Sequence, residues 1–545
     1  MRVRTSIAVV GCAALIAGIA VQLPRATTPL AGRGHLGSSS DSRLLQPNVA
    51  LDMEEPAAPH FIHGVTPRRR RLSPAAAAGG VATAHRAGDR VVTRSGESSP
   101  RALLYRTGFQ AGEPMIGVTK DGSIFFQALD GPPKVIRGTR SANSSFKWED
   151  VSPSLGGRQR HPESLDPYLF VDQRTDRVFT LDFLFGCSEL SFTDDLAKSW
   201  TTSPLQCGEQ DHQTLFAGPP PKSSTAPVGY PDVVYVCSSQ AGATIYSVAA
   251  QCEKSLDGGV SFAPTGEPAY VTDQESENDL GVQGYCHGAI GHGFVGPDGT
   301  VYIPKGFCGQ PWLAISHDEG ATWTRVQVAK NGVPLSPTGV FEHEAAVTAD
   351  TQGNVYYFWM SRDRLPYLAI SRDGGKTWSK PMMIGAPGVK EATLPSLTIG
   401  ADGKIAAVYY GSTNSPGKPF PESKDCKPDP AKCFKALFFL NPPDPARYKN
   451  VTWNGYMTIS ANALAKKPTF YSASINDPSD PFVRGTCGPI RCKAVYDFID
   501  VVIDRQGRPW ASYVDACITT CVTKGPNDVG DEGVVGTLVG GPSLR

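Results

Sequence analysis

The chain has 545 residues, of which 40% are hydrophobic, and its 52 basic and 52 acidic residues give a formal net charge of zero. Residues 1–26 hold three arginines and no acidic residue, and residues 27–100 hold nine arginines against six acidic residues, so residues 101–545 carry a charge of −6. An acidic body excludes nucleic acid as the expected partner. The length would allow several domains, but all-β folds also run large as single units.

The first 26 residues have the pattern of a secretory signal peptide. Two arginines precede a short apolar run that ends in small residues, and this run is too short for a membrane-spanning helix. The sequence "VVGC" at 9–12 resembles a lipoprotein box, but it stands so early that cleavage near residues 20–26 is favoured over lipidation. We expect a secreted or extracellular protein, with cell-surface association as a variant, and no integral membrane segment after cleavage.

Residues 27–100 are predicted to be a disordered leader or pro-segment. They are rich in Ala, Gly, Ser, Pro and Arg and contain few aromatic residues. Such a stretch cannot bury enough apolar area to offset the entropy lost on ordering.

From residue 101 onward helical periodicity is almost absent, and short runs rich in Val, Ile, Tyr and Phe alternate with turn signals. The recurring unit is an apolar strand, a tight turn such as Asp-Gly, and a second, aromatic-rich strand. Such units begin near seven positions: Glu113, Asp166, Asp211, Cys286, Glu342, Leu394 and Asp497. With one further hairpin in each unit, residues 101–545 are predicted to form an all-β propeller of seven four-stranded blades, with six blades as the alternative.

An eight-residue motif recurs on the second hairpins. It reads "SRDGGKTW" at 371–378 and "SHDEGATW" at 316–323, with weaker copies "SLDGGVSF" at 255–262 and "TDDLAKSW" at 193–200. The Asp can accept backbone N–H bonds, the glycines permit the turn, and the Trp can pack on the sheet while its N–H finds a partner. We interpret the motif as a turn that stabilises the fold and lies away from the channel, and we expect its residues not to be catalytic.

Through this motif the chain resembles the Asp-box (BNR-repeat) propellers, the sialidase-like group of secreted proteins, over roughly residues 105–540. The resemblance implies the fold and leaves the activity open, because these propellers include sialidases, other glycan-processing enzymes and binding domains. Sialidases clamp a substrate carboxylate with three arginines, the first in an Arg-Ile-Pro motif. This chain has no such motif, and Arg106 in "YRTG" is the first candidate in its place. An enzyme of this kind would be a glycosidase without a recognisable arginine triad.

The cysteines predict disulfides. Cys12 leaves with the signal peptide, and the remaining twelve form an even set that suits an oxidising compartment. Pairing neighbours in order gives Cys187–Cys207, Cys237–Cys252, Cys286–Cys308, Cys426–Cys433, Cys487–Cys492 and Cys517–Cys521. Paired Cys-x-x-Cys or Cys-x-x-His spacings are missing, so we expect neither a metal site nor a cofactor.

Candidate site residues stand just before the first strand of each unit, because propellers direct these strand ends to one mouth of a central channel. Four neighbouring units bring His and carboxylate residues there. Asp497 and Asp500 either face the channel as well or cap a turn. The predicted catalytic residues are Glu342, Glu344 and Asp211. The predicted substrate-binding residues are His161, Asp166, His212, His287, His343 and Arg106.

Three functions remain open at this point. The first is a glycosidase, in which a carboxylic acid with a raised pKa protonates the leaving oxygen and a second carboxylate or a His acts as nucleophile or base. The second is a non-catalytic recognition or scaffold propeller, in which the polar groups at the mouth bond one another. The third is a polysaccharide lyase, favoured where a His and a Tyr converge beside positive charge. A monomer with a glycan or polysaccharide ligand is expected in each case.

Overall fold

The computed structural model describes residues 83–86, 100–128, 134–141, 145–155, 158–159, 167–182, 186–208, 210–224, 226–240, 250–270, 290–307, 310–330, 345–361, 363–416, 448–485, 495, 497–518, 520–524 and 531–545. All of them belong to one compact unit, Pro59–Arg545.

Seven four-stranded antiparallel sheets, here called blades 1 to 7, follow one another along the chain. Blade 1 consists of β3 (Met115–Val118), β4 (Ile124–Ala128), β5 (Lys134–Arg140) and β6 (Phe146–Asp150). Blade 2 consists of β9 (Tyr168–Asp172), β10 (Arg177–Asp182), β11 (Gly186–Thr193) and β12 (Thr201–Gly208). Blade 3 consists of β13 (Gln210–Gly218), β14 (Val233–Gln240), β15 (Ala250–Ser255) and β16 (Ala263–Pro264). Blades 4 and 5 consist of β17 (Phe294–Val295), β18 (Val301–Phe307), β19 (Gln310–Ser316) and β20 (Thr324–Gln327); and β21 (Ala346–Ala349), β22 (Val355–Met360), β23 (Pro366–Ser371) and β24 (Met382–Met383). Blades 6 and 7 consist of β25 (Glu391–Ile399), β26 (Ile405–Ser412), β27 (Thr452–Ser460) and β28 (Thr469–Ser474); and β30 (Val501–Ile503), β31 (Pro509–Asp515), β32 (Glu532–Val539) and β2 (Arg101–Gln110).

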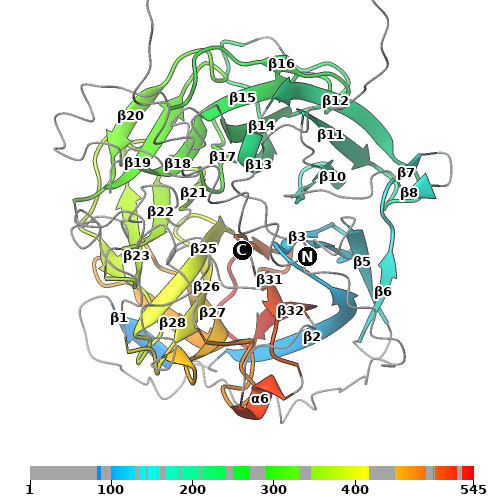
Figure 1. The fold of residues 1–545 in the computed structure, drawn as a ribbon. Coiled ribbons are helices and arrows are strands. Elements are labelled where there is room, and N and C mark those ends of the chain that lie inside the picture. Colours follow the sequence, from blue (N-terminus) through cyan, green and yellow to red (C-terminus); the bar gives the residue numbers. More distant parts are fainter. Residues whose placement is uncertain are drawn as a thin grey trace, which may run out of the picture. The chain divides into compact units, whose positions relative to one another are not determined.

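The seven blades close into a ring (Figure 1). The innermost strands contact one another in the order β3, β9, β13, β17, β21, β25 and β30, and β30 contacts β3 again. Blade 7 is completed by β2, which pairs with β32, so residues 101–110 join the last sheet. The predicted seven-bladed propeller is confirmed, and the six-bladed alternative is wrong because each of the seven predicted hairpins seeds its own sheet.

Short elements decorate the blades. On blade 6, β1 (Thr83–Arg86) pairs with β28 and β29 (Val483–Arg484) pairs with β27. A two-stranded ribbon of β7 (Ser154–Leu155) and β8 (Arg158–Gln159) follows blade 1. The helix α6 (Cys521–Lys524) lies between β31 and β32. The strand β1 lies within the stretch whose composition predicts a leader; the other residues of that stretch, Pro100 apart, and the predicted signal peptide lie outside the described residues.

Aromatic side chains fill the space between neighbouring blades. Phe126, Tyr357, Trp359 and Tyr513 are fully buried, and burying such a side chain stabilises the fold by about 1.5–3 kcal/mol. The hydroxyl groups find backbone acceptors: Tyr357 Oη donates to the Trp312 carbonyl at 2.9 Å, and Tyr513 Oη donates to the Tyr456 carbonyl at 2.8 Å. These rings therefore add apolar contact without leaving a buried polar atom unsatisfied.

The Asp-box motif occupies the turn between the third and fourth strands of blades 2 to 5. In the copy at 371–378 the Asp373 carboxylate accepts bonds from the Thr377 N–H at 2.8 Å and the Thr377 hydroxyl at 2.6 Å, and Ser371 Oγ accepts from the Gly375 N–H. The same bonds recur around Asp318, Asp257 and Asp195. The motif is a self-contained hydrogen-bonded turn, as the residue types predict.

The tryptophans at the end of the motif behave differently from copy to copy. Trp200 Nε1 donates to the Val151 carbonyl and Trp323 Nε1 to the Glu267 carbonyl, each at 2.9 Å, and each bond links the motif to a neighbouring segment. Within the described residues Trp378 Nε1 has no acceptor. Its ring nevertheless packs edge-on to Tyr357 at 6.1 Å.

Two of the predicted disulfides are confirmed, Cys237–Cys252 across β14 and β15 and Cys517–Cys521 beside α6. Cys207 is also disulfide-bonded, and its backbone lies opposite that of Cys187 in the pairing of β11 and β12. The other three predicted pairs, Cys286–Cys308, Cys426–Cys433 and Cys487–Cys492, lie outside the described residues.

Candidate functional site

The starting ends of the innermost strands meet at one mouth of the channel, because these strands run side by side in the same direction around the ring. At that mouth one aromatic ring is shared by four blades. Phe498, just before β30, lies with its ring centroid 5.6 Å from that of His212 and 6.0 Å from those of Tyr168 and His292. All four side chains are buried.

The first polar pair in this cluster is His212 and Asp497. His212 Nε2 lies 3.6 Å from Asp497 Oδ2, with both side chains about 6% exposed. A β-bulge between Asp211 and Thr214 interrupts the pairing of β13 with β14, and His212 within it has a φ of 47°. A non-glycine residue in the left-handed region costs about 1–2 kcal/mol. The bulge is what turns the imidazole toward the carboxylate of blade 7.

The second polar pair is Tyr168 and His292. Tyr168 Oη is 2.8 Å from His292 Nδ1 and 3.4 Å from Thr214 Oγ1, which accepts a bond from the Gly293 N–H at 2.9 Å. Burial lowers the pKa of His292 to about 4, so its imidazole is neutral at neutral pH. The pair thus joins two neutral groups from blades 2 and 4.

Left-handed residues recur at the strand entrances of two further blades. Glu113, before β3, has a φ of 47° and is fully buried, and its N–H donates to the Val495 carbonyl at 3.3 Å. Leu394 has a φ of 54° within a bulge between Thr393 and Ser396 in β25. Strained backbone of this kind persists only where its surroundings hold it, and it gathers at functional sites.

The structure separates the nine sequence-predicted residues into four groups, the last of which is Arg106. His212 lies in the cluster at the channel mouth. Asp211 is adjacent in β13, although its side chain is outside the described part. Six predicted residues lie in segments that the structure does not describe: Glu342, Glu344, His161, Asp166, His287 and His343.

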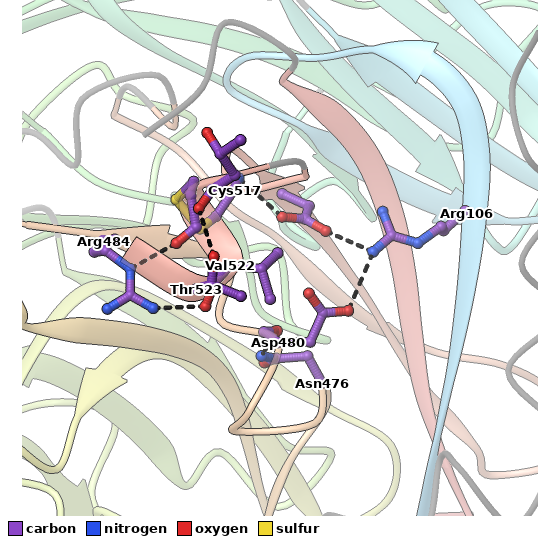
Figure 2. Close-up of a disulfide and its surroundings, with 10 residues drawn as sticks. Arg106, Asn476, Asp480, Arg484, Cys517, Val522 and Thr523 are labelled. Carbon is purple, nitrogen blue, oxygen red and sulfur yellow. Dashed lines mark hydrogen bonds and ion pairs between the residues drawn. A yellow bond between two sulfur atoms is a disulfide. The ribbon is translucent and has the colours of Figure 1, made fainter. Parts of the chain in front are cut away.

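Arg106 is not brought to the Phe498 cluster. It lies on β2, the outermost strand of blade 7, where its guanidinium contacts Asp515 at 2.7 Å and Glu532 at 2.6 Å, with Asp480 at 3.9 Å. Figure 2 shows Arg106 facing Asp480 beside the Cys517 disulfide. The Arg106 guanidinium is thus paired with carboxylates of its own chain. Burial raises the pKa of Asp515 to about 7 despite the nearby guanidinium. A substrate-binding role for Arg106 stays a prediction, and its position gives that role no support.

Sequence reasoning missed Tyr168 and Phe498, because an aromatic residue at a strand start has the pattern of core packing. The available signal was position: Tyr168 is the first residue of β9, and Phe498 follows Asp497. His292 belongs to "GYCHGAIGH" at 284–292, one of the four strand-entrance segments that bring His and carboxylate residues together, although it is not among the predicted binding residues. Within the described ranges, no three His, Cys, Asp or Glu side chains lie close enough together to hold a metal ion, and no helix is long and apolar enough to cross a membrane.

Comparison with known sequences identifies one repeat in the chain. A sequence model of the BNR/Asp-box repeat matches residues 369–380. No curated protein matches the chain in sequence. Among solved structures, a protein of unknown function from Dyadobacter fermentans is similar with 15% identity and a TM-score of 0.36, over 82% of this chain and 98% of that one.

Two further similar structures are carbohydrate-active proteins. The BP39L lectin from Burkholderia pseudomallei has 8% identity and a TM-score of 0.40, over 75% of this chain and 94% of that one. A GH93 α-L-arabinofuranosidase of Fusarium graminearum has 11% identity and a TM-score of 0.36, over 57% and 92%. At such scores these similarities support no conclusion about function.

Proposed function

Because the chain is a seven-bladed Asp-box β-propeller, we propose that it is an exported protein that engages a glycan at the channel mouth and hydrolyses it. The observation that carries the proposal is the cluster around Phe498. Two polar pairs join different blades: His212 with Asp497 joins blades 3 and 7, and Tyr168 with His292 joins blades 2 and 4. A site assembled in this way is rigid, which both recognition and catalysis require.

The chemistry of the cluster suits a hydroxyl-rich ligand. Imidazole, carboxylate and phenol groups supply both donors and acceptors, as the many hydroxyls of a sugar need. In this proposal the buried pairs form the floor of the site, and the catalytic roles of Asp211, Glu342 and Glu344 stay predictions. Because one side chain of each pair fixes the other, the loss of either partner is expected to weaken binding.

A polysaccharide lyase is the second candidate, and the contact between Tyr168 and His292 favours it. A lyase removes a proton beside the carboxyl of an acidic sugar, and a Tyr and a His are suitable base and acid. The neighbouring charged group in the described cluster is Asp497, which would repel such a substrate. We therefore rank the lyase below the hydrolase. A non-catalytic propeller, either a recognition domain or a scaffold, is the remaining alternative, and it also predicts polar groups that bond one another at the mouth.

The test uses the full-length secreted protein on a glycan array and on a panel of polysaccharides. The variants His212→Asn and Asp497→Asn are expected to weaken glycan binding by about tenfold or more, since each side chain positions the other and a site that is held loosely binds less well. Asn tolerates the left-handed backbone at position 212. Asp373→Asn makes the same carboxyl-to-amide change in an Asp-box turn and serves as the control.

The outcomes separate the three functions. Binding that is lost in the cluster variants and kept in Asp373→Asn supports the proposal. New reducing ends without an unsaturated sugar indicate a hydrolase, whereas an unsaturated product indicates a lyase. An array on which the wild-type protein binds no glycan would leave only the scaffold alternative.

A further inference from the structure

Asp500 lies beyond Phe498 on the chain, at the start of β30, and groups from three blades surround its carboxyl. Its Oδ1 accepts bonds from the Ser396 hydroxyl of blade 6 at 3.1 Å and from the Val501 N–H at 2.7 Å. The Ile116 N–H of blade 1 also bonds the carboxyl. Because β25, β30 and β3 are neighbouring innermost strands, the carboxyl lies where three blades meet on the inner side of the ring.

The backbone of Asp500 is held as firmly as its side chain. Its N–H donates to Ser512 Oγ at 3.1 Å, and its carbonyl accepts from the Ser512 N–H at 3.0 Å. The Ser512 hydroxyl in turn donates to the Pro114 carbonyl of blade 1. Asp500 is therefore fixed at the seam where the ring closes, and it is partly open to water although protein surrounds it.

The structure assigns Asp500 as the general acid of a glycoside hydrolase, an inference that rests on the proposed function of the same channel. The placement fits this role in two respects. One carboxyl oxygen is anchored by Ser396 and Val501, and Asp500 is partly exposed whereas Asp497 is buried beside His212. An acid must reach the glycosidic oxygen, so accessibility distinguishes the two carboxyl groups.

The electrostatics agree with the geometry. Burial raises the pKa of Asp500 to about 7, although the Val501 N–H, the Ser396 hydroxyl and the Ile116 N–H stabilise the carboxylate. Among the described groups that contact the carboxyl from β25, β30 and β3, none is charged. A large fraction of Asp500 therefore carries its proton near neutral pH, as a proton donor requires.

The reaction step balances without a cofactor. The bond between the anomeric carbon and the glycosidic oxygen breaks, its electron pair moves to that oxygen, and the Asp500 proton transfers to it to form the released alcohol. A water oxygen bonds to the anomeric carbon, and the proton that this water loses passes to solvent. Asp500 then takes a proton from solvent and returns to its starting state.

The experiment compares aryl glycosides of one sugar that differ in their leaving group. Departure of dinitrophenolate needs little protonation, whereas departure of phenolate depends on an acid. Asp500→Asn is expected to lower kcat for the phenyl glycoside by about 100-fold or more, in the range of general acid catalysis, and to leave kcat for the dinitrophenyl glycoside nearly unchanged. Equal losses on both substrates would overturn the assignment. An unsaturated product would also overturn it. So would a wild-type protein that binds a glycan but cleaves no glycoside, although that result would leave the proposed glycan binding intact.

Ser396→Ala provides the readout if Asp500→Asn does not fold. In the wild-type protein kcat is expected to fall as the pH rises through about 7, because Asp500 loses its proton. The Ser396 bond lowers the pKa of Asp500, so its removal should move this fall in kcat to a higher pH. A merely structural serine would change kcat without moving the profile, and an unmoved profile would overturn the assignment.

Discussion

His212 Nε2 lies 3.6 Å from Asp497 Oδ2, although the two residues belong to blades 3 and 7. Both are buried. The pair joins two blades that are far apart in the sequence. The free energy of interaction between the two side chains can therefore be measured separately from the contribution of each residue to stability.

A double-mutant cycle measures that coupling. We expect His212→Asn and Asp497→Asn each to lower the free energy of unfolding, and the double variant to lose less than the sum, with a coupling of about 1–3 kcal/mol for side chains in contact. Urea unfolding gives the three values. Strict additivity would show that the two side chains do not interact in solution.

The Asp-box turns predict a loss of stability in acid. The Thr377 hydroxyl and N–H, together with the Ser371 hydroxyl, lower the pKa of Asp373 to about 2. A carboxylate whose pKa is lower in the folded state stabilises the fold at pH values above its unfolded pKa of about 3.9. This stabilisation is lost as the pH falls toward 2. Thermal unfolding should show the melting temperature falling in this window. The fall should be shallower in Asp373→Asn, whose residue 373 does not titrate; an equal slope would contradict the prediction.

Two non-glycine residues in one weak copy of the motif have a strained, left-handed backbone, and a substitution can relieve this strain. Leu196 and Ala197 have φ values of 60° and 65°, where the full copy has Gly374 and Gly375. Ala197→Gly should raise the free energy of unfolding by about 1 kcal/mol, because glycine adopts this backbone without steric cost. The reverse change, Gly375→Ala, should destabilise, since the added Cβ would lie 2.6 Å from Ile315 Cδ1. A destabilised Ala197→Gly variant would show that packing outweighs backbone strain there.

A buried carboxyl between blades 2 and 3 gives the opposite pH dependence from the Asp-box residues. Burial, and then the Asp172 carboxylate, raise the pKa of Asp232 to about 7, while Arg174 acts against them. A carboxyl with a raised folded pKa contributes its stability at low pH and loses it as the pH rises toward 7. The melting temperature of Asp232→Asn should therefore rise relative to that of the wild-type protein as the pH increases from about 4 to about 8. A difference that does not grow with pH would show that Asp232 is ionised throughout.

The sequence by itself determined the blade. Alternating apolar strands, Asp-Gly turns and the Asp-box hydrogen bonds are local, because each depends on residues within about ten positions of one another. Hence the seven hairpin starts, the motif turns and the disulfide Cys237–Cys252 could all be predicted, and so could the placement of His212 at a strand entrance.

Only the tertiary structure decided which of these residues meet. The contacts of Phe498 with Tyr168, His212 and His292 exist because the ring closes, and ring closure depends on β2 pairing with β32. Left-handed bulges then turn particular side chains inward, and burial changes their protonation. No local pattern encodes these effects, because they arise from contacts between residues hundreds of positions apart, and Arg106 lies on the outermost strand for the same reason.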